Sequence, residues 1–307
     1  MGSKMDSWDP DSEGPAASPP SKASLKRMQI DLSMIHTQPL PGVVVFPTDN
    51  AKHVWALLSG PEGTPYESAP FLLKVVFPND YPLVPPKVRW VTTGGGAVRF
   101  GPNLYACGKV CLSILGTWSG PSWLPSQNLS TMLLSIQSLM GVDAARNEPG
   151  REDASEAEVK ALNDVLSHET LRVAVLEQTR AALAALAAAR GGAGGGAAPS
   201  AAAPLSVVPP EVHEAVVDSF RDLWENHAQR AREFAAKLDG QPFAEPSVSL
   251  VVGGSHPRKF HFAALAADIE KLAKDLPPRE EEGGEDPSGT AGGRGSGGGG
   301  GGGGGKS

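Results

Sequence analysis

Four short apolar runs between residues 43 and 92 constrain the fold of this chain more than any other feature of its sequence. They are rich in β-branched and aromatic residues, and Pro, Gly, Asn or Asp bounds each one. The runs cover residues 43–46, 53–60, 70–78 and 87–92. Because their connections are short, the sequence predicts an antiparallel meander of four strands. The proline-dense segment NDYPLVPPKV before the last run is predicted to be a fixed loop, since proline suits neither a helix interior nor a central strand.

Helical patterns precede and follow these runs. Apolar residues recur at helical spacing over 21–37 and over 129–140, which predicts two amphipathic helices. Residues 154–190 are strongly helix-prone and fit either one long helix or two, because Ser167 offers a cap in the middle. Further helices are predicted over 211–238 and 257–276, and their apolar stripes require a packing partner. Strands followed by helices, without alternation, indicate an α+β fold.

Segments of biased composition set the predicted domain limits. Residues 1–20 are rich in Pro, Ser and acidic residues, and residues 278–307 are acidic and then almost entirely glycine, so both tails are predicted to be disordered. Residues 188–204 form a low-complexity Ala/Gly segment, which is expected to link a folded domain over 21–187 to a helical extension over 205–277.

Charge and cysteine content exclude several classes of protein. A net charge of −7 and a pI of about 5.5 argue against a nucleic-acid binder, because no basic stripe is available for phosphate contacts. Two cysteines among 307 residues cannot staple a secreted scaffold, which favours a reducing compartment. No apolar run approaches the roughly 20 residues that span a bilayer, and the first residues lack a signal-peptide core. We therefore expect a soluble protein of the cytoplasm, the nucleus or both, without a membrane partner.

Both cysteines lie in the stretch GPNLYACGKVCLSILGTWSGPSW. No histidine accompanies them there, which argues against a structural zinc site, and a disulfide between Cys107 and Cys111 would be labile in a reducing cell. A cysteine hydrolase would need a histidine partner for the thiol, and spatial proximity cannot be read from the sequence. A buried strand with inert thiols is the simplest interpretation, because cysteine is among the most buried residue types.

The surrounding pattern resembles that of the ubiquitin-conjugating enzymes. Their hallmark is His-Pro-Asn, with an active-site Cys eight residues after the Asn. Here Gly101-Pro102-Asn103 precedes GKVCLSIL, which contains Cys111 at that offset. The upstream segment PEGTPYESAPFLLKVVFPNDYPLVPPKV is similar to the family's central strand and proline loop, and the resemblance extends over about 21–180. The segments TTGGGAVRFGPN, GTWSGPSW, NEPG and HETLRVAV are similar to the Z-type members, which the alternative ubiquitin-activating enzyme charges.

This resemblance implies the family's fold: an N-terminal helix, a four-stranded antiparallel meander and C-terminal helices, here with a helical extension. It also implies roles for single residues. Cys111 would carry the modifier as a thioester, and Asn103 would support the oxyanion that forms when a substrate lysine attacks, unless its amide serves only to stabilise a turn. Glu148 is a candidate for activating that lysine. Cys107 is expected to be incidental, and the side chain of Lys109, the nearest cation, is expected to point away from Cys111.

The sequence departs from the family pattern at two positions. Ser113 stands where many members have an Asp that helps to activate the lysine, and a hydroxyl cannot replace a carboxylate in that task. Gly101 stands where the motif has His, which is generally a structural residue, so the departure bears on the stability of the turn more than on the chemistry.

Partners are implied by the same resemblance. They are ubiquitin or a ubiquitin-like modifier, a ubiquitin-activating enzyme of the alternative type, and ubiquitin ligases. The first helix would face the activating enzyme through Lys22, Lys26 and Arg27. Two exposed loops would bind ligases, one through Leu83 and Val84 and the other through Leu124 and Pro125. No metal and no cofactor is expected, because thioester exchange is nearly isoenergetic.

Overall fold

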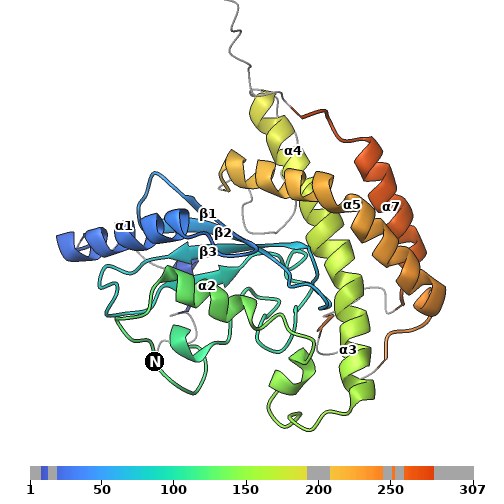
Figure 1. Cartoon of the computed structure of the whole chain (residues 1–307), viewed down its shortest axis with the longest axis horizontal. Coiled ribbons are helices and arrows are strands. Elements are labelled where there is room, and N and C mark those ends of the chain that lie inside the picture. The colour runs from blue at the N-terminus through green and yellow to red at the C-terminus, as the bar shows by residue number, and fades with distance from the viewer. Residues whose placement is uncertain (1–7, 13–18, 192–207, 245–250, 253–258, 280–307) are drawn as a thin grey trace, which may run out of the picture. The chain divides into compact units, whose positions relative to one another are not determined.

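The four predicted strands form one antiparallel sheet. A computed structural model describes residues 8–12, 19–191, 208–244, 251–252 and 259–279. Within them the strands β1 (Val43–Pro47), β2 (His53–Ser59), β3 (Pro70–Val76) and β4 (Lys87–Trp90) follow one another in the order of the chain (Figure 1). Each strand pairs with the next in antiparallel register, for example Leu58 opposite Phe71. This confirms the predicted meander.

The helix α1 (Lys22–Thr37) packs beside the sheet and against α2 (Leu129–Gln137). Ser21 begins it as an N-cap, with its hydroxyl accepting a hydrogen bond from the Ser24 backbone N–H at 3.1 Å. The helix buries Met28 and Ile35, and also the carboxylate of Asp31. Asp31 accepts hydrogen bonds from the Tyr81 hydroxyl and from the Leu129 backbone N–H. This buried carboxylate therefore ties α1 to the proline loop and to α2.

The helix-prone segment after the meander is one continuous helical run. It comprises α3 (Glu156–Glu169), the π-helical segment η5 (Thr170–Glu177) and α4 (Gln178–Arg190). Ser155 begins the run with a capping box that involves Glu158. Ser167 does not act as a cap, because it lies inside α3 with helical residues on both sides. From Thr170 the hydrogen bonding changes to the π-helical pattern, so the helical run continues without a break.

The C-terminal extension consists of α5 (Pro210–Leu238) and α7 (Phe262–Lys274). The two helices pack on each other, α5 also packs on α4, and Figure 1 shows all three together with α3 in one half of the picture. The predicted helix over 211–238 is confirmed, whereas the last helix begins at Phe262 rather than at residue 257. Residues up to Asp275 make one compact unit, so the extension and the sheet belong together. Of the predicted linker over 188–204, residues 188–190 belong to α4 and residues 192–204 lie outside the described residues, as do 205–207 of the predicted extension.

A short part of the N-terminal segment contacts the sheet. Residues 8–12 include a 3-10 turn, Pro10–Ser12. Asp9 and Asp11 form ion pairs with Arg89 on β4, and Asp11 also pairs with Lys74 on β3. The contact of residues 8–12 with the sheet differs from the disorder expected over 1–20. Acidic residues disfavour folding of an isolated segment, but here they form ion pairs with cationic side chains of the sheet. Residues 1–7 and 13–18, and likewise 280–307 of the predicted C-terminal tail, lie outside the described residues.

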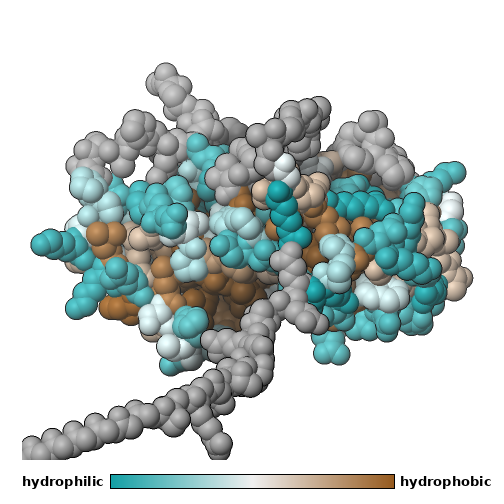
Figure 2. Space-filling model, turned by 90° about the horizontal axis from the view of Figure 1, so that it is seen from above, coloured by the Kyte–Doolittle hydropathy of each residue, from teal (hydrophilic) through white to brown (hydrophobic). Residues whose placement is uncertain are grey.

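Large apolar side chains also reach the surface. Figure 2 shows hydrophobic residues, in brown, gathered between hydrophilic ones on one face. In the described ranges, large apolar side chains with high exposure lie on helices, on loops and on β1: Ile30, Val44, Leu83, Val84, Trp118, Leu124, Leu134 and Val142. Among the described residues, no helix combines the length and the apolar character that a membrane span requires.

Candidate active site

Asn103 and Cys111 lie opposite each other across a tight hairpin. The Cys111 backbone N–H donates to the Asn103 carbonyl at 2.8 Å, Leu104 pairs with Val110, and the Tyr105 N–H donates to the Lys109 carbonyl at 3.0 Å. Gly108 closes the turn with a φ of +91° and a hydrogen bond to the Tyr105 carbonyl. The eight-residue offset is thus a pairing register, which places both functional side chains on one face.

The backbone after Cys111 is fixed by one threonine. The Thr117 hydroxyl accepts a hydrogen bond from the Leu112 N–H at 2.9 Å and donates to the Val110 carbonyl at 2.6 Å. A 3-10 turn, Ser113–Leu115, lies between them and ends at Gly116 in the left-handed region. Ser113 lies against Gly120: a Cβ added at Gly120 would be 3.0 Å from the Ser113 Cβ. This serine therefore lies against the longer loop.

The electrostatic setting of Cys111 combines burial with nearby cations. The residue is only 3% exposed, and burial raises the pKa of its thiol above the ordinary value. Lys109, Tyr105 and Arg99 act in the opposite direction and lower this pKa. Lys109 acts on the thiol because residues two apart in a strand share a face, and the direction of its side chain stays a prediction. The thiol is thus protonated at rest and lies among groups that stabilise its anion.

The Asn103 amide already has a structural partner. Its Nδ2 donates to the Cys111 backbone carbonyl at 3.0 Å, while its Oδ1 is buried without a hydrogen-bond partner. Both tasks expected of this residue, holding the turn and supporting an oxyanion, draw on the same N–H₂ group. Since that group carries two hydrogens, one can remain on the carbonyl while the other serves a ligand.

Arg99 and Tyr105 are site residues that were not predicted. The Arg99 guanidinium lies 4.2 Å from the centre of the Tyr105 ring, and Tyr105 is on the face of the hairpin that carries Cys111. Arg99 also forms an ion pair of 2.9 Å with Glu148. Glu148 is therefore engaged by a cation, and its role in lysine activation stays a prediction. Tyr105 could have been found from its spacing, because residues 103 and 105 share a face of the hairpin.

Comparison with known proteins agrees with this geometry. The family "Ubiquitin-conjugating enzyme" matches residues 27–167. The chain is similar to proteins named ubiquitin-conjugating enzyme E2 Z, at 46% identity over 176 residues in Homo sapiens, with 55% of this chain and 49% of that protein covered. In Danio rerio the values are 45% over 177 residues, 56% and 53%. A probable ubiquitin-conjugating enzyme, protein 17 of Caenorhabditis elegans, is 45% identical over 133 residues, 40% of this chain and 18% of that protein.

Residues 27–167 are therefore a ubiquitin-conjugating domain, and this domain is similar to that of the Z-type enzymes. The predicted family and fold are thereby confirmed. The chain spans about half the length of the E2 Z relatives that it matches.

The two candidate ligase loops of this ubiquitin-conjugating domain are joined to each other. The Trp123 indole N–H donates to the Pro82 carbonyl at 2.7 Å. Beside this contact Leu83 is 74% exposed and Leu124 is 60% exposed, and Val84 and Pro125 are exposed as well. The structure thus brings the four predicted residues to one exposed apolar tip, and their binding role stays a prediction.

The three predicted contacts to the activating enzyme differ from one another. Lys22 and Lys26 are exposed on α1. Arg27 instead pairs with Asp31 at 2.8 Å and donates to the backbone carbonyls of Pro125 and Gln127. The Arg27 side chain therefore anchors the loop of Pro125 and Gln127 to α1, and its charge is paired within the domain.

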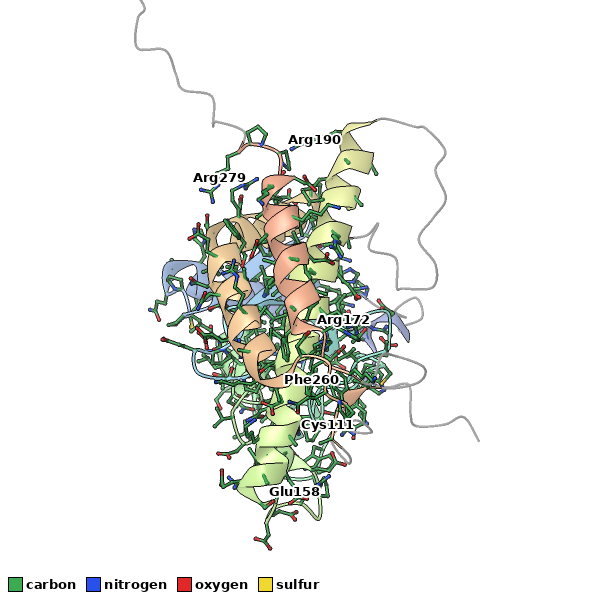
Figure 3. The ribbon with its side chains drawn as sticks, turned by 90° about the vertical axis from the view of Figure 1, so that its right-hand side faces the viewer. Cys111, Glu158, Arg172, Arg190, Phe260 and Arg279 are labelled. Carbon is green, nitrogen blue, oxygen red and sulfur yellow. The ribbon has the colours of Figure 1, made fainter. Side chains whose placement is uncertain are left out.

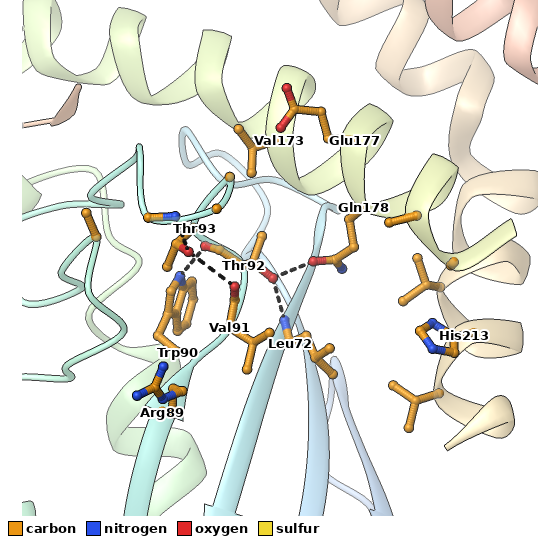
Figure 4. Close-up of a pocket in the computed structure, with 18 of the residues that line it drawn as sticks. Leu72, Arg89, Trp90, Val91, Thr92, Thr93, Val173, Glu177, Gln178 and His213 are labelled. Carbon is orange, nitrogen blue, oxygen red and sulfur yellow. Dashed lines mark hydrogen bonds between the residues drawn. The ribbon is translucent and has the colours of Figure 1, made fainter. Parts of the chain in front are cut away.

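A cavity of about 400 Å³ lies apart from Cys111, between the end of β4, the turn Gly94–Gly96 and the helical run (Figure 4). Its walls include Trp90, Val173 and His213, and Cys107 lies at it as an exposed free thiol. The polar groups of its walls bond one another: the Thr92 hydroxyl accepts from the Leu72 N–H at 2.9 Å and donates to Gln178. Within the part of the chain that the structure describes, no cluster of His, Cys, Asp and Glu is suited to hold a metal.

Proposed function

We propose that this protein accepts ubiquitin, or a ubiquitin-like modifier, as a thioester on Cys111 and transfers it to lysine side chains of substrates, usually with a ligase. The observation that carries the proposal is the hairpin that places Asn103 directly opposite Cys111. A carbonyl carbon bonded to the sulfur would lie beside an amide donor on the same face. That is the arrangement that acyl transfer requires.

The chemistry proceeds in two balanced steps. The Cys111 thiolate attacks the thioester carbonyl of the charged activating enzyme, and the thiolate of that enzyme leaves. A neutral lysine amine then attacks the new thioester, an amide bond forms, the amine loses a proton, and Cys111 departs as a thiol. The intermediate formed by lysine attack carries an oxyanion, which the neutral amide N–H of Asn103 would stabilise without protonating the nucleophile. ATP is consumed earlier by the activating enzyme, so the conjugating domain needs no cofactor for these steps.

Finer features of the proposal rest on the similarity to the Z-type enzymes and on exposed residues. The activating enzyme would be the alternative type and would meet α1 at Lys22 and Lys26. Ligases would bind the tip formed by Leu83, Val84, Leu124 and Pro125. The site of action would be the cytoplasm, the nucleus or both. A cysteine hydrolase finds less support, because no histidine stands between Gly101 and Trp123 to serve as a base for the thiol.

A charging assay tests the proposed function. The full chain is incubated with ATP, ubiquitin and, in separate reactions, the general or the alternative activating enzyme. We expect an adduct that thiols cleave, which Cys111→Ser converts into a thiol-resistant oxyester and Cys107→Ser leaves unchanged. If neither activating enzyme forms an adduct with the wild-type chain, Cys111 is not a thioester carrier and the proposal fails.

A further inference from the structure

The guanidinium of Arg99 is the centre of a contact network around the thioester site. Its Nε donates to the Gly101 carbonyl at 3.1 Å, and its Nη2 donates to the Pro102 carbonyl and to a Glu148 oxygen. Its face lies against the Tyr105 ring. The side chain is 18% exposed, so these contacts are largely shielded from water. A planar fork of five N–H donors can satisfy carbonyls and a carboxylate together, which a lysine ammonium cannot do with the same geometry.

These contacts converge on the two residues that face Cys111. The Gly101 and Pro102 carbonyls immediately precede Asn103, so their position fixes where the Asn103 side chain begins. Tyr105 follows Asn103 by two residues on the same strand of the hairpin, so it lies on that face as well. Gly101 itself cannot hold the turn with a side chain, because its φ is +116° and an added Cβ would lie 3.1 Å from the Tyr66 hydroxyl. The restraint that a histidine side chain could provide at this position must come from elsewhere.

The backbone of Arg99 is held by the C-terminal extension. Its N–H donates to the Val251 carbonyl at 2.7 Å, and Val98 pairs with Val252 as an antiparallel bridge. Val98, Val251 and Val252 are all buried. A short piece of the extension therefore lies against the segment that enters the catalytic hairpin, at the residue from which the network starts.

We propose that Arg99 is a positioning residue of the thioester site: it holds the Gly101–Pro102 turn and the Tyr105 ring so that Asn103 and Tyr105 face Cys111, and residues 251–252 of the extension hold Arg99 itself. This inference rests on the proposed function, since it concerns transfer from a Cys111 thioester. Arg99 touches neither the modifier nor the lysine. It acts through the hairpin, and it compensates the Glu148 charge beside the site.

Two substitutions separate the charge of Arg99 from its geometry. Arg99→Lys keeps the positive charge but loses the planar set of guanidinium donors, and Arg99→Gln loses both the charge and these donors. The matched control is Arg151→Gln. This substitution removes another arginine–glutamate ion pair, the one of 2.8 Å between Arg151 and Glu158. All proteins carry Cys107→Ser so that Cys111 is the single thiol. Thermal unfolding is recorded for each variant.

The first measurement is discharge of the preformed Cys111 thioester to free lysine in single turnover. We expect Arg99→Lys and Arg99→Gln each to slow discharge at least tenfold while charging falls less than threefold, and Arg151→Gln to leave both unchanged. Discharge at the wild-type rate in Arg99→Gln overturns the proposal. Equal losses of charging, discharge and melting temperature overturn it as well, because Arg99 would then serve only the fold.

The second measurement needs no ubiquitin. The rate of Cys111 alkylation by iodoacetamide is followed against pH, with Lys109, Tyr105 and Arg99 as the charged and titratable groups around the thiol. We expect the midpoint to move upward in Arg99→Gln and to stay near the wild-type value in Arg99→Lys. An unchanged midpoint in Arg99→Gln contradicts the placement of Arg99 beside the thiol. If the wild-type chain fails to charge but this shift is seen, the proposed function fails while the placement of Arg99 is supported.

Discussion

A single amide, that of Asn103, serves both the shape and the proposed chemistry of the site. One of its N–H bonds goes to the Cys111 carbonyl, whereas its buried oxygen has no partner. An unsatisfied buried oxygen is unfavourable for folding, which indicates that the orientation of the amide is set by its donors. The oxyanion role and the turn role are therefore not alternatives: the bond that holds the turn also aims the second N–H.

Asn103→Ala should separate discharge from charging. We expect discharge to lysine to fall about 10²–10³-fold, because one oxyanion donor contributes about 2.7–4 kcal/mol to lowering the barrier. The lost bond to the Cys111 carbonyl should lower the free energy of unfolding by only about 1 kcal/mol. Single-turnover discharge and denaturant unfolding measure the two effects. A variant that discharges normally yet unfolds easily would show that Asn103 is purely structural.

The spacing between Asn103 and Cys111 could be predicted because hairpin pairing is local. The contacts of Arg99 could not: its bond to Glu148 joins residues 49 apart, and no local pattern fixes such a partner. Arg27 illustrates the same limit, since the sequence shows a basic helix face but not that one of its charges binds a loop 98 residues away.

At the scale of elements, the helical run from α3 to α4 is continuous because its midpoint is buried. The His168 ring lies among Phe243, Phe260 and Phe262 of the extension, and its Nε2 accepts the His261 backbone N–H at 3.2 Å. Figure 3 labels Phe260 of this cluster together with Cys111 and Arg172. Nδ1 of His168 lies 2.9 Å from the Glu169 carboxylate, so its proton is directed there. A helix break at Ser167 would separate these groups from the face that the extension covers.

Glu169→Gln should destabilise this junction. Burial acts to raise the pKa of Glu169, but hydrogen bonds from His168 and Arg172 outweigh it, and the pKa is lowered overall. We expect a loss of about 3 kcal/mol in the free energy of unfolding at pH 7, since removing one partner of a buried ion pair leaves the other uncompensated. Glu156→Gln, at a side chain that is 87% exposed, is the control and should change little.

The pH dependence of the same variant gives a second criterion. A lowered pKa in the folded state stabilises the protein above the unfolded pKa of about 4.3, and that contribution is lost as the pH falls through the folded value. The difference in stability between wild type and Glu169→Gln should therefore shrink below about pH 4. A difference that stays constant into the acid range would mean that the Glu169 charge contributes nothing to folding.

In the molecule as a whole, the contacts between the described part of the extension and the conjugating domain include three hydrogen bonds that lie far apart in the sequence. Arg230 on α5 donates to the Thr64 carbonyl at 2.7 Å, His261 donates to His168, and Val251 accepts from Arg99. The sequence could predict that the apolar stripes of α5 and α7 are covered, because amphipathic helices need a partner. It could not predict where they pack, since these contacts join segments from 93 to 166 residues apart.

The stability of this compact unit should depend on His227, which is buried in α5 at 2% exposure with no partner for its Nε2. Burial, aided by the nearby Arg230 charge, lowers the pKa of His227 from 6.5 to about 4. The folded protein therefore keeps this ring neutral where the unfolded chain would protonate it, so stability falls as the pH drops from about 6.5 to about 4. The shift corresponds to roughly 3 kcal/mol at most.

His227→Leu replaces the ring by an apolar side chain that cannot titrate. We expect denaturant unfolding to show a smaller stability loss between pH 7 and pH 5 than in the wild type, because the unfolded wild type gains a proton there and the variant does not. At pH 7 the variant should be at least as stable, since no buried nitrogen is left unpaired. His36→Gln, at an exposed residue of α1, is the control and should keep the wild-type dependence. Equal losses in His227→Leu and the wild type would show that His227 is protonated in the folded protein.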